Sequence, residues 1–261
     1  MARGSTGAAS SRSPGPPSAA IPPRSRLNEL PFGLHSRDEA VNYFAWQARC
    51  FRAHVHGHVL DHGAGTGALS ARLLELPLER LTVLEPEPVL SELLRERFES
   101  CTKADVYIGT LEAYRRQHAG AALDCIVSSN VIEHIDDDVA CLRTMFELLR
   151  PGGRACLYVP ARPELYGTLD EEVGHFRRYT TSDLRTKLER AGFVVERLAY
   201  RNLVATLPWF VTGRVLGRRR IEKGGVQLFD RWVFPVTRWL EDAVEPPYGL
   251  NVVAVGAKPA R

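Results

Sequence analysis

Three glycines occupy every second position of one short segment, and an aspartate precedes them. In "VLDHGAGTGALS" (residues 59–70) the glycines are Gly63, Gly65 and Gly67, and the aspartate is Asp61. Because glycine has no Cβ, the backbone of such a loop can approach a ligand closely. The helix predicted to follow would present its N-terminal N–H groups to the same ligand. The segment therefore predicts a loop that binds a small-molecule cofactor.

An acidic residue at the end of the next apolar stretch is predicted to complete this site. Glu85, in "LTVLEPEP", stands where a carboxylate can accept hydrogen bonds from two ribose hydroxyls. A solvated turn residue is the plainer alternative. Gly63, Gly65 and Ala68 also satisfy the G-x-G-x-x-A pattern of dinucleotide-binding dehydrogenases. The Tyr that precedes a Lys by four positions in short-chain dehydrogenases is absent from the sequence.

A second group of reactive side chains lies in "DEEVGHFRRYT" (residues 170–180). His175 can accept a proton near neutral pH, so we predict that it is a catalytic base. Arg178 can hold a substrate carboxylate or phosphate. Tyr166 precedes this stretch and Tyr179 lies within it, and both are predicted to contact the substrate. An internal salt-bridge network that fastens this segment to the fold is the alternative.

Alternating apolar stretches and helical patterns predict the elements that position these residues. Strands separated by helices imply parallel crossovers with both sheet faces covered, which is a doubly wound α/β fold. Ligands of such sheets lie beyond the carboxyl ends of the strands. The predicted strands are a short one in 58–65 that ends in a turn, followed by 81–88, 104–110, 123–128 and 154–160. The predicted helices are 36–55, capped by Ser36, 68–80, 89–100, 137–150, stopped by "PGG", and one capped by Thr180 or Thr181 that runs through Leu188.

Four segments in order, "VLDHGAGTGALS", "LTVLEPEP", "LDCIVSSNVIEHIDD" and "LRPGGRACLYVP", resemble the motif series of class I S-adenosylmethionine-dependent methyltransferases. The resemblance covers roughly residues 36–193. Residues 174–180 are similar to a G-H-x-R-R-Y-[ST] segment of a bacterial subgroup of this superfamily. The resemblance implies a seven-stranded, Rossmann-like sheet with an antiparallel edge. Residues 193–200 and 249–258 can supply that edge.

The resemblance also implies a role for each position that matches the motifs. Thr110 departs from many relatives, which place an aspartate there for the adenine amino group. The implied S-adenosylmethionine contacts are Asp61, Gly63, Gly65 and Gly67 for the methionine part, Glu85 for the ribose, Gly109, Thr110 and Leu111 beside the adenine, and Asn130 and Val131 near the reactive sulfur.

The segment "NVIEHI" is similar to the E-x-x-E-H pattern proposed to hold a metal in ubiquinone-biosynthesis O-methyltransferases. Glu133 and His134 match this pattern, but Asn130 replaces its first carboxylate. A neutral amide is a weaker ligand for a hard cation. We therefore expect no metal at this site.

Composition limits the classes of protein to consider. The chain has 261 residues and a formal net charge of +3, which is too mild a positive charge to indicate nucleic-acid binding. The five cysteines are scattered, without a C-x-x-C pair, which predicts a reduced, cytoplasmic protein without structural zinc. Residues 1–35 are rich in Gly, Ser, Ala and Pro and are predicted to be a disordered tail before a domain of residues 36–261.

The segment between the two predicted edge strands, residues 201–248, is longer than a hairpin requires. It is apolar and aromatic, with arginines interleaved. A lid over the substrate site is the first interpretation. Peripheral contact with an anionic membrane surface is the alternative, because basic amphipathic helices can lie on bilayers.

These features together predict a methyltransferase that uses S-adenosylmethionine. The expected acceptor is a small molecule or a glycan- or lipid-linked molecule, methylated at oxygen. Methylation at nitrogen of a secondary metabolite or peptide and a non-catalytic, cofactor-binding regulatory protein are the alternatives.

Overall fold

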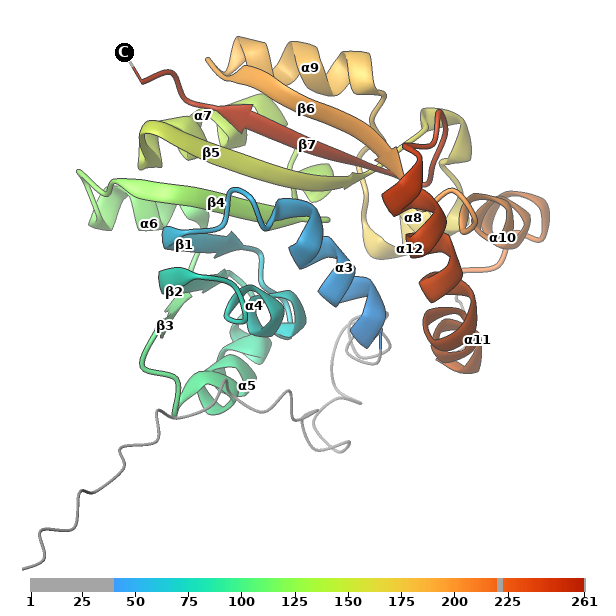
Figure 1. Ribbon diagram of the computed structural model, residues 1–261, viewed down its shortest axis with the longest axis horizontal. Helices are drawn as coiled ribbons and strands as arrows, with labels where there is room; N and C mark the ends of the chain where they lie inside the picture. Colours follow the sequence, from blue (N-terminus) through green and yellow to red (C-terminus); the bar gives the residue numbers. More distant parts are fainter. Residues whose placement is uncertain (1–39, 220–222, 261) are drawn as a thin grey trace, which may run out of the picture.

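The computed structural model of the chain describes residues 40–219 and 223–260. Its seven strands form one sheet in the order β3-β2-β1-β4-β5-β7-β6 (Figure 1). β7 runs antiparallel to both of its neighbours, β5 and β6, so the predicted antiparallel edge is confirmed. The strands are β1 (Gly57–His62), β2 (Leu78–Glu85), β3 (Ala104–Ile108), β4 (Leu123–Ser129), β5 (Leu149–Pro160), β6 (Val194–Arg201) and β7 (Asn251–Ala257).

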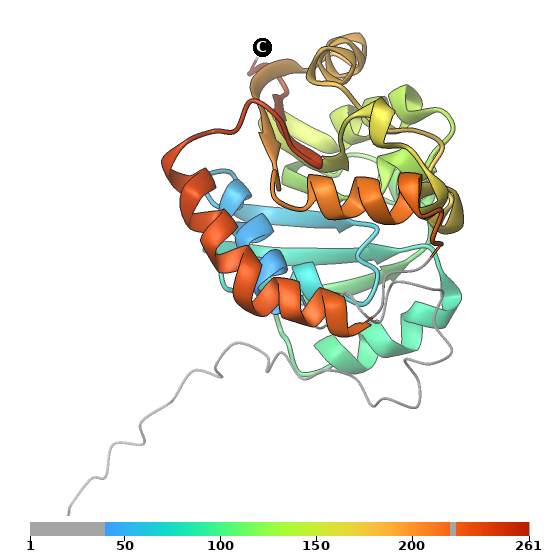
Figure 2. The same cartoon turned by 90° about the vertical axis from the view of Figure 1, so that its right-hand side faces the viewer.

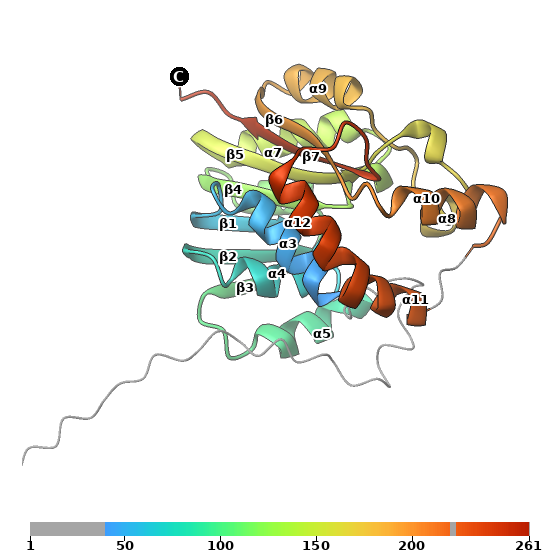
Figure 3. The ribbon, with the colours of Figure 1, turned by 45° about the vertical axis from the view of Figure 1, so that its right-hand side comes forward.

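Helices cover both faces of this sheet, as the doubly wound prediction requires (Figures 1 and 3). α3, α4 and α5 lie on one face, and α6, α7 and α9 lie on the other. The α-helices are α3 (Val41–Phe51), α4 (Ala68–Leu73), α5 (Pro88–Phe98), α6 (Leu111–Gln117), α7 (Asp138–Leu148), α8 (Thr168–Val173), α9 (Thr181–Arg190), α10 (Thr206–Phe210), α11 (Lys223–Leu228) and α12 (Phe234–Ala243). Short helical turns are η1 (Ile132–His134), η2 (Pro163–Leu165), η3 (Val211–Val215) and η4 (Phe229–Val233).

Alternation along the central strands builds two hydrophobic cores. On β1, Val59 packs with Trp46 of α3, whereas its neighbour Leu60 packs into the core that contains Leu142 of α7. Successive strand residues point to opposite faces, so a strand covered on both sides must be apolar throughout. Burial of each such side chain contributes about 1.5 to 3 kcal/mol to stability. The two cores therefore fix the helices on both faces of the sheet.

Several predicted boundaries differ from the observed ones. The helix predicted for residues 68–80 ends at Leu73. β2 already begins at Leu78, and Arg80, which was predicted to be helical, pairs with His58 of β1. Pro77 separates the two elements, because proline cannot continue a helix. α7 ends at Leu148, and β5 already includes "PGG". Of the predicted helix 36–55, the described part starts at Val41.

Capping of α9 follows the prediction. The side chain of Thr180, not Thr181, accepts a hydrogen bond from the Asp183 amide at 3.0 Å. The predicted Ser36 cap and the predicted tail of residues 1–35 lie outside the described residues.

The segment between β6 and β7 contains α10, α11 and α12. α12 lies beside α3, whereas α10 lies near α8 (Figure 3). Asp230 fastens this segment to α3, because its carboxylate accepts hydrogen bonds from the amides of Asn42 and Tyr43. The buried Glu241 of α12 accepts hydrogen bonds from the Asn202 and Leu203 amides. No helix in the described part of the chain combines the length and the apolar character needed to cross a membrane.

Candidate cofactor and substrate site

A cavity of about 830 Å³ lies at the carboxyl edge of the sheet. Its lining includes residues that follow β1, β2, β3 and β4, together with residues of α3 and α10. A volume of this size is at the upper end of the range for small-molecule sites, about 300 to 1,000 Å³. The cavity therefore has room for a nucleoside cofactor and a second molecule.

The glycine loop enters this cavity between β1 and α4. Gly63, Gly65 and Gly67 have φ angles of 70°, 58° and 80°, in the left-handed region that favours glycine. The Gly63 and Ala64 amides donate to the Leu84 carbonyl, which ties the loop to β2. Gly63 and Gly65 line the cavity, but Gly67 does not. A Cβ on Gly67 would lie 2.8 Å from the Phe98 ring, so helix packing explains this third glycine.

Two buried carboxylates flank the loop and line the cavity. Asp61 accepts a hydrogen bond from the Ser70 hydroxyl at 2.5 Å, and burial raises the pKa of Asp61 to about 7. Glu85 accepts hydrogen bonds from the Gly65 amide at 2.7 Å and the Glu87 amide at 3.0 Å. Burial raises the pKa of Glu85, and these two hydrogen bonds offset only part of that effect. Each carboxylate keeps lone pairs for a ligand.

The predicted adenine and sulfur contacts fall in the same cavity, with one exception. Thr110, Leu111, Asn130 and Val131 line it, whereas Gly109 does not; the Gly109 amide donates to the Glu85 carbonyl instead. The Thr110 hydroxyl caps α6 by accepting a hydrogen bond from the Ala113 amide at 3.2 Å. It can still donate its own hydrogen to a ligand.

His175 lines the cavity from the segment after α8 and is held on one side by Asp170. Its Nδ1 lies 2.7 Å from Asp170 Oδ1, and its backbone amide donates to the Asp170 carbonyl. Burial raises the pKa of Asp170, but the hydrogen bond from His175 and the charge of Arg178 lower it more, so it lies below its usual value. An ionised Asp170 favours the tautomer with hydrogen on Nδ1, which we assign from this contact. The Nε2 of neutral His175 is then a proton acceptor.

Arg178 also lines the cavity, although it is almost fully buried. Its Nε donates to Asp170 Oδ1 at 2.8 Å, and its Nη1 donates to the Ala161 carbonyl at 2.9 Å. The guanidinium carbon lies 4.9 Å from the centre of the Trp209 ring. Arg178 and His175 therefore share one carboxylate, which is the internal network named above as the alternative to catalysis.

The placement of the two tyrosines does not support the predicted substrate contacts. Tyr179 is fully buried outside the cavity, and its hydroxyl donates to Asp138 at 2.9 Å. Tyr166 is also outside the cavity lining, and its hydroxyl donates to the His175 carbonyl at 2.8 Å. Both hydroxyls form hydrogen bonds inside the protein, and these bonds hold the segment that contains His175.

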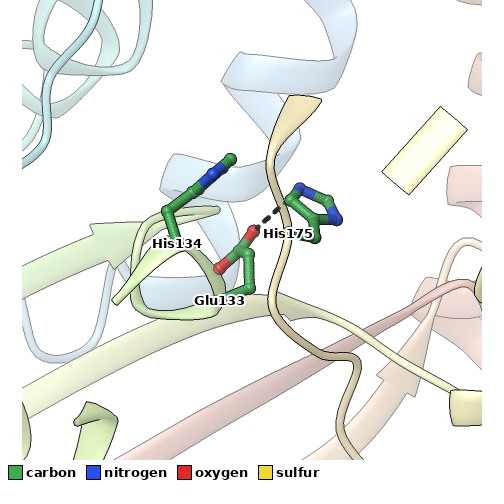
Figure 4. Close-up of side chains that lie close together, drawn as sticks. All are labelled: Glu133, His134 and His175. Atoms are coloured by element: carbon green, nitrogen blue, oxygen red, sulfur yellow. Dashed lines mark ion pairs between the residues drawn. The ribbon is translucent and has the colours of Figure 1, made fainter. Parts of the chain in front are cut away.

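Glu133, His134 and His175 form a compact cluster (Figure 4). Each offers a ligand atom, and these atoms lie within 4.8 Å of one another. Glu133 is fully buried, with Oε1 3.8 Å from His175 Nε2, and the ring centroids of the two histidines are 4.7 Å apart. Two imidazoles and a carboxylate can bind a divalent metal, or they can move a proton. The sequence motif pairs Glu133 with His134, but it does not indicate that His175 lies beside them.

Two aromatic residues that line the cavity were not predicted from the sequence. Trp209 of α10 and Tyr43 of α3 both line it. Tyr43 was predicted only as part of a helix, and no motif marks either residue. Both are brought to the cavity by long-range packing: the Tyr43 ring packs against Phe234 of α12, and the Trp209 ring lies over Arg178.

The sequence of residues 35–198 matches a family described as a methyltransferase domain. A ubiquinone biosynthesis O-methyltransferase of Xanthomonas axonopodis pv. citri (strain 306) is 31% identical over 100 residues, 38% of this chain and 41% of that protein. The chain therefore matches about two fifths of the length of this curated relative.

Solved structures share the fold at lower identity. The 1,6-didemethyltoxoflavin-N1-methyltransferase of Burkholderia thailandensis has a TM-score of 0.53 and 20% identity, covering 85% of this chain and 80% of that one. The [4+2]-cyclase SpnF has a TM-score of 0.57 and 14% identity, covering 83% of this chain and 81% of that one. The fold alone therefore does not determine the reaction. The family match, which covers more than half of the chain, does decide membership: the chain belongs to the class I S-adenosylmethionine-dependent methyltransferases.

Proposed function

We propose that this chain transfers a methyl group from S-adenosylmethionine to a hydroxyl group of a small molecule or a glycan- or lipid-linked acceptor. One observation carries the proposal: His175, oriented by Asp170, lines the same cavity as the glycine loop. The name of the curated relatives, O-methyltransferases, supports oxygen as the acceptor atom. We also propose, from the sequence of residues 174–180, that the chain belongs to the bacterial subgroup that has the G-H-x-R-R-Y-[ST] segment.

The described residues fit the cofactor. The positive φ of Gly65 and its missing Cβ leave the loop backbone open to a ligand, and the Glu85 carboxylate can receive ribose hydroxyls. Asp61 would face the methionine part, whose ammonium group it attracts when ionised. When bound, the cofactor supplies an activated methyl group on its sulfonium, so the protein needs to position the acceptor and remove its proton.

His175 is the proposed proton acceptor. The hydrogen bond to Asp170 leaves Nε2 with its lone pair, and Glu133 Oε1 at 3.8 Å stabilises the imidazolium that forms when Nε2 takes a proton. We propose that no metal takes part, since a metal on Nε2 would block this atom.

We propose that residues 201–248 form a lid over the acceptor. Trp209 lines the cavity and stacks near Arg178. The segment is fastened to the α8 region, because the Thr168 hydroxyl donates to the Gly213 carbonyl and Arg214 Nη1 donates to the Tyr166 carbonyl. A cover of this kind excludes water from the reacting groups.

The proposal is tested by incubating the full chain with isotopically labelled S-adenosylmethionine and fractionated metabolite and lipid extracts. Mass spectrometry should reveal a product that has gained one labelled methyl group, and the 13C chemical shift of that methyl group in NMR would distinguish an oxygen acceptor from a nitrogen acceptor. Label transfer to nitrogen would overturn the choice of atom. Cofactor binding without label transfer to any fraction would favour the non-catalytic alternative.

Glu85→Ala is expected to weaken the affinity for S-adenosylhomocysteine by about 1.5 to 3 kcal/mol, the scale of hydrogen bonds to a charged group. Isothermal titration calorimetry measures this change. Glu79→Ala is the control, because Glu79 is an exposed carboxylate at the other end of the same strand. Tight NAD binding by the unmodified chain, without a response to S-adenosylhomocysteine, would contradict the cofactor assignment.

Affinity for S-adenosylhomocysteine is expected to rise between pH 6 and pH 8 because of Asp61. Its pKa of about 7 means that the carboxylate loses its proton over this interval, and only the ionised form attracts the ligand's ammonium group. Calorimetry at both pH values should give a slope that Asp61→Asn removes. An equal slope in Asp61→Asn would assign the titration to another group.

A further inference from the structure

The outward side of α12 is apolar, which is unusual for a surface helix. Phe234, Thr237 and Glu241 form its buried stripe. On the opposite side, Val236 is 58% exposed and Trp239 is 70% exposed, and Trp232 in the preceding turn is 64% exposed. The spacing from Trp232 to Val236 to Trp239 follows one helical face. Such a face is expected to be polar when it meets only water.

α10 and the turn after it repeat this arrangement. Leu203, Leu207, Phe210 and Val211 are exposed and follow one another at helical spacing, and Leu207 is 68% exposed. α10 has no buried residue in the described structure. We call these four residues, together with Trp232, Val236, Trp239 and Leu240, the apolar face.

The apolar face stands apart from the rest of the described surface. Outside residues 203–244, the large hydrophobic side chains exposed in the described chain are Val41, Val89, Phe176 and Val194. Figure 2 shows α10, in orange, and α12, in red, on the same side of the molecule in front of the sheet. Exposed apolar residues gathered in this way mark an interaction surface.

Charge indicates what this surface meets. Among the described side chains of residues 203–244, the basic ones are Arg214, Arg218, Arg219, Arg231 and Arg238, whereas the acidic ones are Asp230, Glu241 and Asp242. Glu241 is buried and accepts hydrogen bonds from backbone amides, and Asp242 forms an ion pair with Arg49. Asp230 is buried and is used to cap α3. Exposed aromatic and aliphatic side chains interleaved with arginines are complementary to the interface of an anionic bilayer, where Trp rings lie at headgroup level.

We propose that α10 and α12 dock this protein on the surface of an anionic lipid bilayer. Trp209 of α10 lines the cavity while Leu207 and Phe210, on the same short helix, face outward. Docking would therefore place the covered side of the cavity against the membrane, where a lipid-linked molecule is concentrated. The docking itself does not depend on the methyl-transfer proposal.

The test measures binding of the full chain to vesicles of phosphatidylcholine, with or without about 30 mol% phosphatidylglycerol, by co-sedimentation. Binding is expected to the anionic vesicles and to weaken as salt concentration rises. Trp232→Gln/Trp239→Gln should lower the vesicle affinity by on the order of a hundredfold, and Val236→Gln by on the order of tenfold. Arg231→Gln/Arg238→Gln should reduce the preference for anionic vesicles.

Val194→Gln is the matched control for Val236→Gln. The two valines are 57% and 58% exposed, but Val194 lies on edge strand β6, away from the apolar face. Vesicle affinity should be unchanged in Val194→Gln, and thermal unfolding should show that all variants remain folded. Equal losses in the two valine variants would overturn the proposal.

Two further outcomes would also overturn it. One is the absence of binding to both kinds of vesicle. The other is a dimer in light scattering that Trp232→Gln/Trp239→Gln converts to a monomer without any vesicle binding, which would assign the face to a second copy of the chain. Calorimetry with S-adenosylhomocysteine on the same samples tests the cofactor site separately, so the failure of one proposal is distinguishable from the failure of the other.

Discussion

His175→Ala is expected to lower the rate of methyl transfer by about a hundredfold or more, the usual contribution of a general base, while leaving the affinity for S-adenosylhomocysteine unchanged. The alanine removes Nε2, which lies 3.8 Å from Glu133 Oε1, but it leaves the glycine loop intact. Label transfer to the acceptor identified from extracts measures the rate, and calorimetry measures the affinity.

The pH dependence provides a second readout of the same role. A base must be unprotonated, so the unmodified rate at subsaturating acceptor should fall once the pH is low enough to protonate the base. His175→Ala should lose this dependence and keep a low, flat rate. A structural residue would change the stability but not the shape of the pH profile.

The internal network makes a different prediction for the same variant. Asp170 holds both His175 and Arg178, so a purely structural His175 would lower thermal stability and cofactor affinity together when it is removed. The folded fraction would then retain its turnover. That result would assign His175 to the fastening of its segment and would contradict the base.

A metal at the Glu133–His134–His175 cluster would give a third pattern. Turnover of the unmodified chain is expected to persist after treatment with EDTA, because a metal bound to Nε2 would use the lone pair with which the proposed base accepts a proton. Loss of turnover with EDTA, restored by a divalent cation, would make these three residues ligands. His134→Ala would then be as damaging as His175→Ala.

Features that depend on residues close together in the sequence, such as strands and helix caps, could be predicted from the sequence. The parallel strands follow from buried apolar stretches, and the cap on α9 follows from a hydroxyl residue at the start of a helical pattern. Gly63 and Glu85 were placed correctly at the ends of β1 and β2, because parallel strands bring their carboxyl ends to one edge. The helix predicted for 68–80 was too long, since leucines suit either a helix or a buried strand.

Contacts between distant segments could not be predicted in this way. Which of the residues in 170–180 face the cavity depends on how the segment turns after α8. As a result His175 and Arg178 line the cavity, while Tyr179 is buried against Asp138. Trp209 reaches the cavity from α10, and the turn that follows α10 is tied to α8 by the hydrogen bond from the Thr168 hydroxyl to the Gly213 carbonyl. No spacing rule in the sequence encodes either arrangement.

Gly65→Val is expected to weaken the affinity for S-adenosylhomocysteine by about a hundredfold or more, equivalent to about 2.8 kcal/mol. Gly65 lines the cavity with a φ of 58°, and its amide donates to the Glu85 carboxylate at 2.7 Å. A branched side chain would fill ligand space and strain a left-handed backbone, so the loop would lose both its close approach and its link to Glu85.

Backbone strain has to be separated from loss of ligand space in this experiment. Gly217→Val provides the control, because Gly217 has a φ of 59° and a Cβ placed there would meet nothing within 4 Å. The two variants should lose similar amounts of thermal stability, but calorimetry should show the loss of affinity in Gly65→Val alone. If Gly65→Val stays folded and binds S-adenosylhomocysteine as the unmodified chain does, the cofactor lies elsewhere in the cavity. An equal loss of affinity in both variants would instead mean that strain transmitted through the fold, and not contact with the loop, controls binding.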